Sequence, residues 1–184
     1  IGYDPRQPIA YNVLQHSIIR RASRPVSITP LVLSQLPLER RGLTEFTYSR
    51  FLVPFLSDYV GKSVFMDADM VCTGDIAELF EATDGLSAVS VMQGQPKFEW
   101  PSLMVFNNAC CKVLTPEFVE DKRNALLDLS WARSIGQVPE AWNHCVGYME
   151  PKEAALYHFT QGIPAWFETK GLPEDEAWEN ERKA

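Results

Sequence analysis

The feature that most constrains this chain is an apolar run that ends in two carboxylates, in the sequence SVFMDADMVCTGD at residues 63–75. The run begins like a short buried strand, and Asp67 and Asp69 follow at its carboxyl end. Ionised carboxylates resist burial unless a cation or a set of hydrogen-bond donors meets them. The sequence therefore predicts either a metal site or a structural polar network at the end of this strand.

Helical and strand patterns alternate along the chain, which predicts an α/β fold with a mostly parallel central sheet flanked by helices. The expected strands are residues 26–33, 63–67, 86–92, 103–106 and 155–159, and the expected helices are residues 5–24, 45–59, 75–81 and 115–132. In open α/β sheets, ligands bind beyond the carboxyl ends of the strands. Residues 3–4 and 67–69 both fall at such ends.

The acidic balance of the chain limits its expected partners. A net charge of −7 argues against binding to nucleic acid or to anionic membranes, which need clustered Lys and Arg. The 4 cysteines form no Cys-x-x-Cys pair and have no zinc-type spacing with histidine, so we expect free thiols in a reducing compartment and a cytoplasmic location. No run of about 18 apolar residues occurs, and we expect neither a membrane span nor a signal peptide.

Three interpretations of the Asp67-Ala68-Asp69 triplet follow from its chemistry. Oxygen ligands suit Mg²⁺ or Mn²⁺, and an octahedral ion leaves positions for substrate phosphates. A structural interpretation has Asp67 capping a turn and Asp69 solvated. Haloacid-dehalogenase phosphatases also end a strand in Asp-x-Asp, but that fold uses its first strand, and here 66 residues come first. The later aspartates that such a phosphatase would need are isolated, at Asp84, Asp121 and Asp128.

Several segments together resemble the retaining family 8 glycosyltransferases, the group of glycogenin and the bacterial lipopolysaccharide galactosyl- and glucosyltransferases. TYSRF at residues 47–51, followed by VFMDADMVCTGDIAELF, is similar to the family's helix, Asp-x-Asp strand and short helix. HFTQGIPAW at residues 158–166 resembles its C-terminal His, Gly, Pro and Trp signature. Similar segments are also IGYDPR at residues 1–6, SLMVFNN at 102–108 and VPEAWNHCVGY at 138–148.

The resemblance implies a single GT-A domain over residues 1–168, followed by a charged tail over residues 169–184. The charged composition from Gly171 onward predicts that this tail is loose. The resemblance also implies transfer of a sugar, with retention, from a UDP-sugar to an acceptor that the sequence leaves open, with a glycan or a lipopolysaccharide among the candidates. The implied cofactor is Mn²⁺ (or Mg²⁺), held by Asp67, Asp69 and His158. The alternative for His158 alone is a hydrogen-bonded histidine in the core.

The resemblance assigns nucleotide-binding roles to residues beside the metal ligands. Tyr3 would stack on the base, and Asp4 would accept a hydrogen bond from its ring. Ala68 is small, as a position near the ribose requires, and Gly162 would let the backbone approach the diphosphate. For Tyr3 and Asp4, the alternatives are ordinary turn chemistry and helix capping.

Two further residues would contact the sugar. Arg50 would reach the sugar or a phosphate from the preceding helix, with an exposed helical arginine as the alternative. Asn107 would hydrogen-bond to hydroxyls of the donor sugar, and with Asp67 and Asp69 it completes the predicted catalytic set.

The sequence also departs from the family pattern on the sugar side of the site. No Asp-Gln pair precedes Trp142-Asn143, and Ala109 stands where the family has glycine. No catalytic nucleophile can be assigned. These departures keep open a catalytically inactive module that binds nucleotide sugars.

Overall fold

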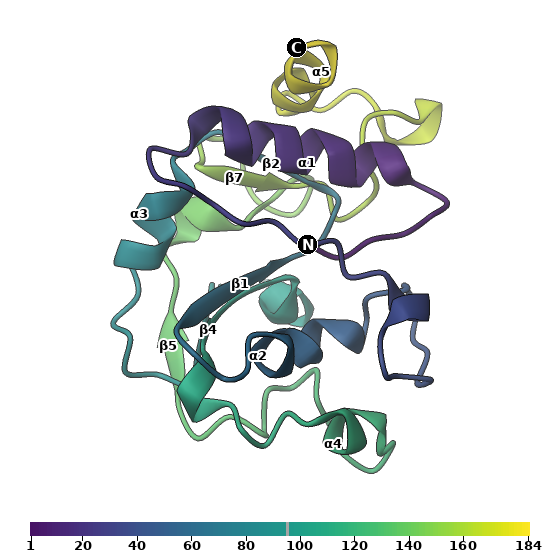
Figure 1. Cartoon of the computed structure of the whole chain (residues 1–184). Helices are drawn as coiled ribbons and strands as arrows, with labels where there is room; N and C mark the ends of the chain where they lie inside the picture. The colour runs from purple at the N-terminus through teal and green to yellow at the C-terminus, as the bar shows by residue number, and fades with distance from the viewer. Residues whose placement is uncertain (95) are drawn as a thin grey trace.

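Two mixed β-sheets and the helices around them form the fold in the computed structural model, which describes residues 1–94 and 96–184 (Figure 1). The strand order is β1-β4-β3-β5 in the first sheet and β2-β7-β6 in the second. The strands are β1 (Lys62–Met66), β2 (Met70–Cys72), β3 (Val89–Val91), β4 (Leu103–Asn107), β5 (Ile135–Gln137), β6 (His144–Cys145) and β7 (Leu156–His158). The α-helices are α1 (Pro8–Arg21), α2 (Val53–Leu56), α3 (Ile76–Glu81), α4 (Pro116–Glu120) and α5 (Asp175–Lys183). The 3-10 turns are η1 (Leu33–Gln35), η2 (Ser49–Leu52), η3 (Lys97–Ser102), η4 (Asn108–Cys110), η5 (Glu140–Trp142) and η6 (Phe167–Thr169).

The α/β class is confirmed, but the pairing is less parallel than the sequence predicted. β4 pairs antiparallel with both β1 and β3, and β2 pairs antiparallel with β7. The parallel pairs are β3 with β5 and β6 with β7. A parallel connection needs a crossover of about a dozen residues, usually with a helix. The described residues of the β3–β4 connection form the 3-10 turn η3 and no α-helix, and the chain returns antiparallel.

Three predicted helices are shorter in the structure because local contacts stop them. The first helix starts at Pro8 instead of Pro5, since the Asp4 carboxylate accepts hydrogen bonds from Arg6 and closes a turn there. The second is reduced to η2 and α2, and it ends where Asp58 and Tyr59 adopt positive φ angles.

The third predicted helix, over residues 115–132, is α4 alone. Thr115 caps its start by accepting from the Phe118 amide, as the sequence suggests. At the other end, Asp121 is extended and its carboxylate accepts from the backbone and the guanidinium of Arg123. A side chain that bonds to its own local backbone offers the chain an alternative to the helix.

The charged C-terminal segment is not loose, contrary to the sequence prediction. Its last part forms α5, which packs against α1 (Figure 1) and also contacts β2. The Trp178 side chain is fully buried, and the Glu181 carboxylate is 1% exposed. Glu181 lies 2.7 Å from Arg21 Nη1 and 2.6 Å from His16 Nδ1. The boundary at residue 168 itself remains a prediction.

All four cysteines are free thiols, as their spacing predicts. Cys110 is exposed and the other three are buried. Burial raises the pKa of the Cys72 and Cys111 thiols to about 12. These two thiols are therefore protonated core residues with little nucleophilic character. No helix in the described part of the chain is long and apolar enough to cross a bilayer.

Removing the Trp178 side chain should test how firmly α5 is attached. We expect Trp178→Ala to lower the free energy of unfolding by about 3–5 kcal/mol, because it leaves a large cavity between α5 and the body of the protein. Asn180→Ala, on the exposed face of the same helix, is the matched control. Urea denaturation measures both variants, and a loss below about 1 kcal/mol for Trp178→Ala would mean that α5 contributes little to the fold.

Candidate functional site

The two aspartates of the Asp-x-Asp triplet lie in the turn that joins the two sheets. Asp67 follows β1, and Asp69 precedes β2. His158, the last residue of β7, pairs with Met70 in the register of β2 and β7, which brings it beside Asp69. The Phe159 amide fixes this arrangement by donating to the Asp69 carbonyl at 2.8 Å. Residues separated by about 90 positions thus meet through one strand pair.

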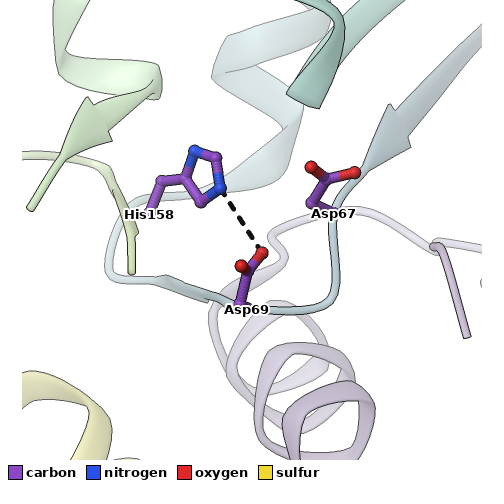
Figure 2. A group of neighbouring side chains, drawn as sticks. All are labelled: Asp67, Asp69 and His158. Atoms are coloured by element: carbon purple, nitrogen blue, oxygen red, sulfur yellow. Dashed lines mark ion pairs between the residues drawn. The ribbon is translucent and has the colours of Figure 1, made fainter. Parts of the chain in front are cut away.

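The three side chains converge on one point (Figure 2). One ligand atom from each of Asp67, Asp69 and His158 lies within 4.8 Å of the others. His158 Nε2 is 3.4 Å from Asp69 Oδ1. The Oδ1 atoms of both aspartates are buried and accept no hydrogen bond from the described residues, although an ion-pair partner lies near each. Buried oxygens without donors fit a divalent cation, and two carboxylates with an imidazole are suitable ligands for Mn²⁺.

The electrostatics of the cluster also favour a cation. Burial raises the pKa of Asp67 to about 7, and the charge of Asp69 adds to the rise while Arg50 opposes it. Burial alone would lower the pKa of His158, but the carboxylates of Asp69 and Glu99 hold it well above the usual value. The cluster on its own therefore retains protons that a divalent cation would displace.

Asn143 orients the His158 ring. The Asn143 amide nitrogen donates to Ser102 Oγ at 3.0 Å, which turns its Oδ1 toward His158 Nδ1 at 3.2 Å. Oδ1 can only accept, so Nδ1 carries a proton and Nε2 is the nitrogen that faces Asp69. A histidine ligand fixed in this way by its second nitrogen is typical of metal sites. The sequence prediction did not include Asn143 or Ser102 in the site.

Arg50 is buried in the structure and not exposed on a helix. Its Nη2 lies 3.0 Å from Asp67 Oδ1, its Nη1 donates to the Pro101 carbonyl at 2.8 Å, and its Nε donates to the Phe46 carbonyl at 3.1 Å. Its guanidinium also lies over the Phe65 ring, 4.8 Å from the centroid. Arg50 thus forms an ion pair with Asp67, and its contact with a sugar or phosphate remains a prediction.

The N-terminal residues lie beside the carboxyl end of β1. The Gly2 amide donates to the Met66 carbonyl at 2.9 Å, so the next residues pass close to the Asp-x-Asp turn. Tyr3 packs edge-on against Tyr11 with ring centroids 5.5 Å apart, and Asp4 pairs with Arg6. Contacts of Tyr3 and Asp4 with a base remain predictions.

The small residues of the site have structural reasons that need no ligand. Ala68 is buried between the two aspartates. Gly162 has a φ of +116°, which L side chains rarely adopt, and an added Cβ would lie 2.8 Å from Thr169 Cγ2. Ala68 lies between Asp67 and Asp69 in the chain, and Gly162 follows His158, so their roles beside the ribose and the diphosphate stay predictions.

The structure does not bring Asn107 into the cluster. Asn107 pairs with Lys62 at the start of β1, whereas Asp67 follows Met66 at the other end. Five residues of strand, about 16 Å, separate the two ends. Asn107 Nδ2 donates instead to the Gly85 carbonyl at 2.8 Å. The motif Phe-Asn was correctly placed on a strand, but an antiparallel register turns its asparagine away from the site.

Residues before β4 occupy the place predicted for Asn107. The Asp67 amide donates to the Ser102 carbonyl at 2.9 Å, and Glu99 Oε2 lies 3.8 Å from His158 Nδ1. Burial raises the pKa of Glu99. The antiparallel direction of β4 was the signal needed to find these residues, and the sequence pattern did not supply it.

Comparison with known proteins agrees with this geometry. The model of glycosyl transferase family 8 matches residues 11–171. The chain belongs to this family. Protein CDI of Arabidopsis thaliana is 34% identical to this chain. The alignment is 220 residues long and covers 98% of this chain and 84% of that protein. The resemblance inferred from the sequence is confirmed, and the phosphatase alternative is set aside.

Solved structures show that the family 8 chain has the predicted GT-A fold. GlyE of Streptococcus pneumoniae TIGR4 matches 100% of this chain with a TM-score of 0.73 at 15% identity. LgtC, a galactosyltransferase solved with donor and acceptor sugar analogs, matches 99% of this chain with a TM-score of 0.61 at 11% identity. The chain spans 94% of LgtC but only 59% of GlyE and 51% of the bifunctional glycosyltransferase WbbM.

Replacing Arg50 should reveal the cost of the buried Asp67 carboxylate. We expect Arg50→Met, measured by urea denaturation with a chelator present, to lose about 3–5 kcal/mol, because Asp67 is left buried without its cationic partner. Arg50→Met combined with Asp67→Asn should recover more than half of that loss, since no charge then remains to be compensated. Equal stability of the single and double variants would contradict the pairing.

Proposed function

We propose that this chain is a metal-dependent glycosyltransferase that moves a sugar from a UDP-sugar to an acceptor with retention of configuration. The single observation that carries the proposal is the convergence of Asp67, Asp69 and His158 within 4.8 Å in a family 8 chain. The likeness to LgtC, solved with donor and acceptor sugar analogs, supports a nucleotide-sugar donor. Family membership supports retention, and it leaves a glycan or a lipopolysaccharide as a candidate acceptor.

Some residues of the site would bind the cation, and others position these ligands. Asp67, Asp69 and His158 would hold Mn²⁺ (or Mg²⁺) with one ligand atom each. When bound, the ion supplies Lewis-acid stabilisation for the charge that develops on a diphosphate leaving group. Arg50 positions Asp67 and offsets its charge, and Asn143 holds His158 with its Nε2 on the side of Asp69, where it could serve as a ligand.

The nucleotide would lie along the segments that meet at the Asp-x-Asp turn. Tyr3 and Asp4 would contact the base, Ala68 would leave room for the ribose, and the turn at Gly162 would approach the diphosphate. These assignments come from the family resemblance, and the position of each segment beside the cluster supports them. Asn107 is not included, because its strand register places it at the far end of β1.

One observation favours a second candidate, an inactive module that binds nucleotide sugars. The metal cluster is intact, but the sugar-side motifs are altered, with no Asp-Gln pair before Trp142 and with Asn107 away from the site. Release of free sugar from a UDP-sugar in the presence of Mn²⁺, even at a slow rate, separates the two functions. Turnover supports the enzyme, and metal-dependent binding without any turnover supports the module.

Calorimetric titration of UDP tests the metal-dependent donor site. We expect binding that requires Mn²⁺ and that is stronger for UDP than for GDP. Asp69→Asn should reduce the UDP affinity to its metal-free level, because one anionic ligand of the ion is lost. Asp84→Asn, an exposed carboxylate at the opposite end of the sheet, should bind like the parent. Unchanged Mn²⁺-dependent affinity in Asp69→Asn would exclude the site.

A substitution at Asn143 tests the orientation of His158 separately from the ligands themselves. We expect Asn143→Ala to weaken Mn²⁺ binding by about 10–100-fold, because the ring loses the acceptor that fixes its Nδ1 proton. Asn143→Asp keeps an acceptor at the same place and should retain most of the affinity. Calorimetry with Mn²⁺ alone measures both variants, and equal affinities for Asn143→Ala and the parent would show that the contact does not position the ligand.

A further inference from the structure

The rings of Phe98 and Tyr148 form an aromatic pair at the surface of the protein. Their centroids lie 5.8 Å apart and their planes are at 78°, which is an edge-to-face arrangement. Phe98 is 65% exposed and Tyr148 is 51% exposed. Among the aromatic pairs of the described residues, this is the pair in which both members are exposed. Large rings that stay in water give up the free energy of burial, so an ordered pair of them is a candidate contact surface for a ligand.

Each ring of the aromatic pair comes from a segment that contacts His158. The Tyr148 amide donates to the Cys145 carbonyl at 3.1 Å, and Cys145 pairs with His158 in the register of β6 and β7. Phe98 lies in η3 directly before Glu99, and Glu99 Oε2 is 3.8 Å from His158 Nδ1. Two segments that are far apart in the sequence thus place the aromatic pair beside the candidate metal cluster.

The turn that carries Tyr148 also packs against the loop that follows β7. Gly147 has a φ of +80°, and a Cβ added there would lie 3.2 Å from Gln161 Nε2. Gln161 directly precedes Gly162, where the backbone is proposed to approach the diphosphate. A molecule bound on the aromatic pair would therefore lie next to the proposed donor, as an acceptor must.

A carboxylate next to the rings supplies a hydrogen-bond acceptor. The Glu99 side chain is 14% exposed, so its carboxylate remains accessible to a bound molecule. The Glu99 carbonyl accepts from Ser102 Oγ at 2.6 Å, which fixes the turn that carries the side chain. The Lys97 ammonium of the same turn lies over the Trp100 ring, 5.1 Å from its centroid. The turn η3 thus presents one apolar ring and one anionic acceptor in consecutive residues.

We propose that Phe98, Tyr148 and the Glu99 carboxylate form the acceptor subsite and bind a neutral pyranose residue of a glycan. This inference rests on the proposed function, because it names the class of molecule that receives the sugar. The C–H groups along one face of a pyranose ring carry a slight positive charge and pack against the negative face of an aromatic ring. A hydroxyl of the same sugar donates to a Glu99 oxygen, and hydrogen bonds to a carboxylate are stronger than those to neutral acceptors.

The charge of the surface favours a neutral sugar over other occupants. An apolar peptide would cover the Glu99 carboxylate without giving it a donor, which is costly where the contact excludes water. A second copy of this chain, with its net charge of −7, would bring like charges together. A uronic acid would place its own carboxylate near Glu99. A neutral hexose brings an apolar face and only hydroxyl groups, so it satisfies both parts of the surface.

Saturation-transfer NMR with lactose, cellobiose and maltose, in the presence of UDP and Mg²⁺, tests the subsite without requiring turnover. We expect at least one of these disaccharides to bind the parent chain. Phe98→Ala and Tyr148→Ala should each weaken its binding by at least about 10-fold, because a ring face is lost. Tyr148→Phe keeps the ring and should bind like the parent. Leu86→Ala, which removes an apolar side chain that is 82% exposed, is the matched control and should also bind like the parent.

Substitutions at Glu99 test the polar half of the subsite. Glu99→Ala should weaken binding of the same disaccharide by about 10-fold, because a hydroxyl loses its charged acceptor. Glu99→Gln keeps a neutral acceptor at the same place and should recover part of that loss. Methyl β-D-glucuronide should bind more weakly to the parent chain than methyl β-D-glucoside does, and Glu99→Gln should reduce this difference.

Four results would overturn the subsite. The first is that none of the three disaccharides binds the parent chain. The second is equal disaccharide affinity for the parent, Phe98→Ala and Tyr148→Ala. The third is tighter binding of the glucuronide than of the glucoside, which would indicate an anionic acceptor. The fourth is self-association of the parent chain that Phe98→Ala abolishes in sedimentation, which would identify a second copy as the occupant.

Titration of UDP with Mg²⁺ into each aromatic variant separates this inference from the proposed function. Both rings are largely in solvent and neither belongs to the metal cluster, so we expect parent-like UDP affinity in Phe98→Ala and Tyr148→Ala. Metal-dependent UDP binding with no ring-dependent disaccharide binding would remove the subsite and leave the donor site in place. Ring-dependent disaccharide binding in a chain that does not bind UDP would support the subsite and contradict the proposed function.

Discussion

The rest of the site depends on one constraint, which is that the Asp67 carboxylate is buried where the two sheets meet. Burial of a carboxylate is costly, and the structure meets the cost partly with the Arg50 guanidinium at 3.0 Å. Arg50 donates in turn to the carbonyls of Phe46 and Pro101, so its guanidinium is held in place beside Asp67. Asp67 Oδ1, the oxygen 3.0 Å from Arg50 Nη2, still accepts no hydrogen bond within the described structure. This incomplete compensation is what makes the position suitable for a cation.

His158, the third residue of the cluster, is also held by buried polar neighbours. His158 is buried at the end of β7, and Asn143 and Ser102 form a short polar chain behind it. Asn143 donates to Ser102 and accepts from His158 Nδ1, so this chain does not use His158 Nε2, which faces Asp69. The departures from the family pattern lie elsewhere, on the sugar side of the site. The residues of the cluster are therefore kept in a chain whose sugar-side motifs differ from the family pattern.

The sequence predicted the three clustered residues better than it predicted their surroundings, for physical reasons. A strand that ends in two aspartates and a distant histidine are local patterns, and Asp67, Asp69 and His158 do converge. The predicted place of Asn107 in the site was wrong because strand direction depends on long-range pairing, which no local pattern contains. The prediction of a loose tail was wrong because the many charged residues on the exposed side of α5 outweighed Trp178, which is on the buried side, in the composition. The predicted helices were too long where the carboxylates of Asp4 and Asp121 accept hydrogen bonds from backbone amides two residues further on.

The Asp-x-Asp turn joins a four-stranded sheet to a three-stranded one, and this connectivity has a mechanical consequence. Asp67 extends from the first sheet, while Asp69 and His158 belong to the second. An ion held by all three would act as a cross-link between the sheets. Its binding energy would then add to the stability of the folded chain, and the relative placement of the two sheets would set the ligand spacing. Donor binding and the rigidity of the whole domain would become two measures of one equilibrium.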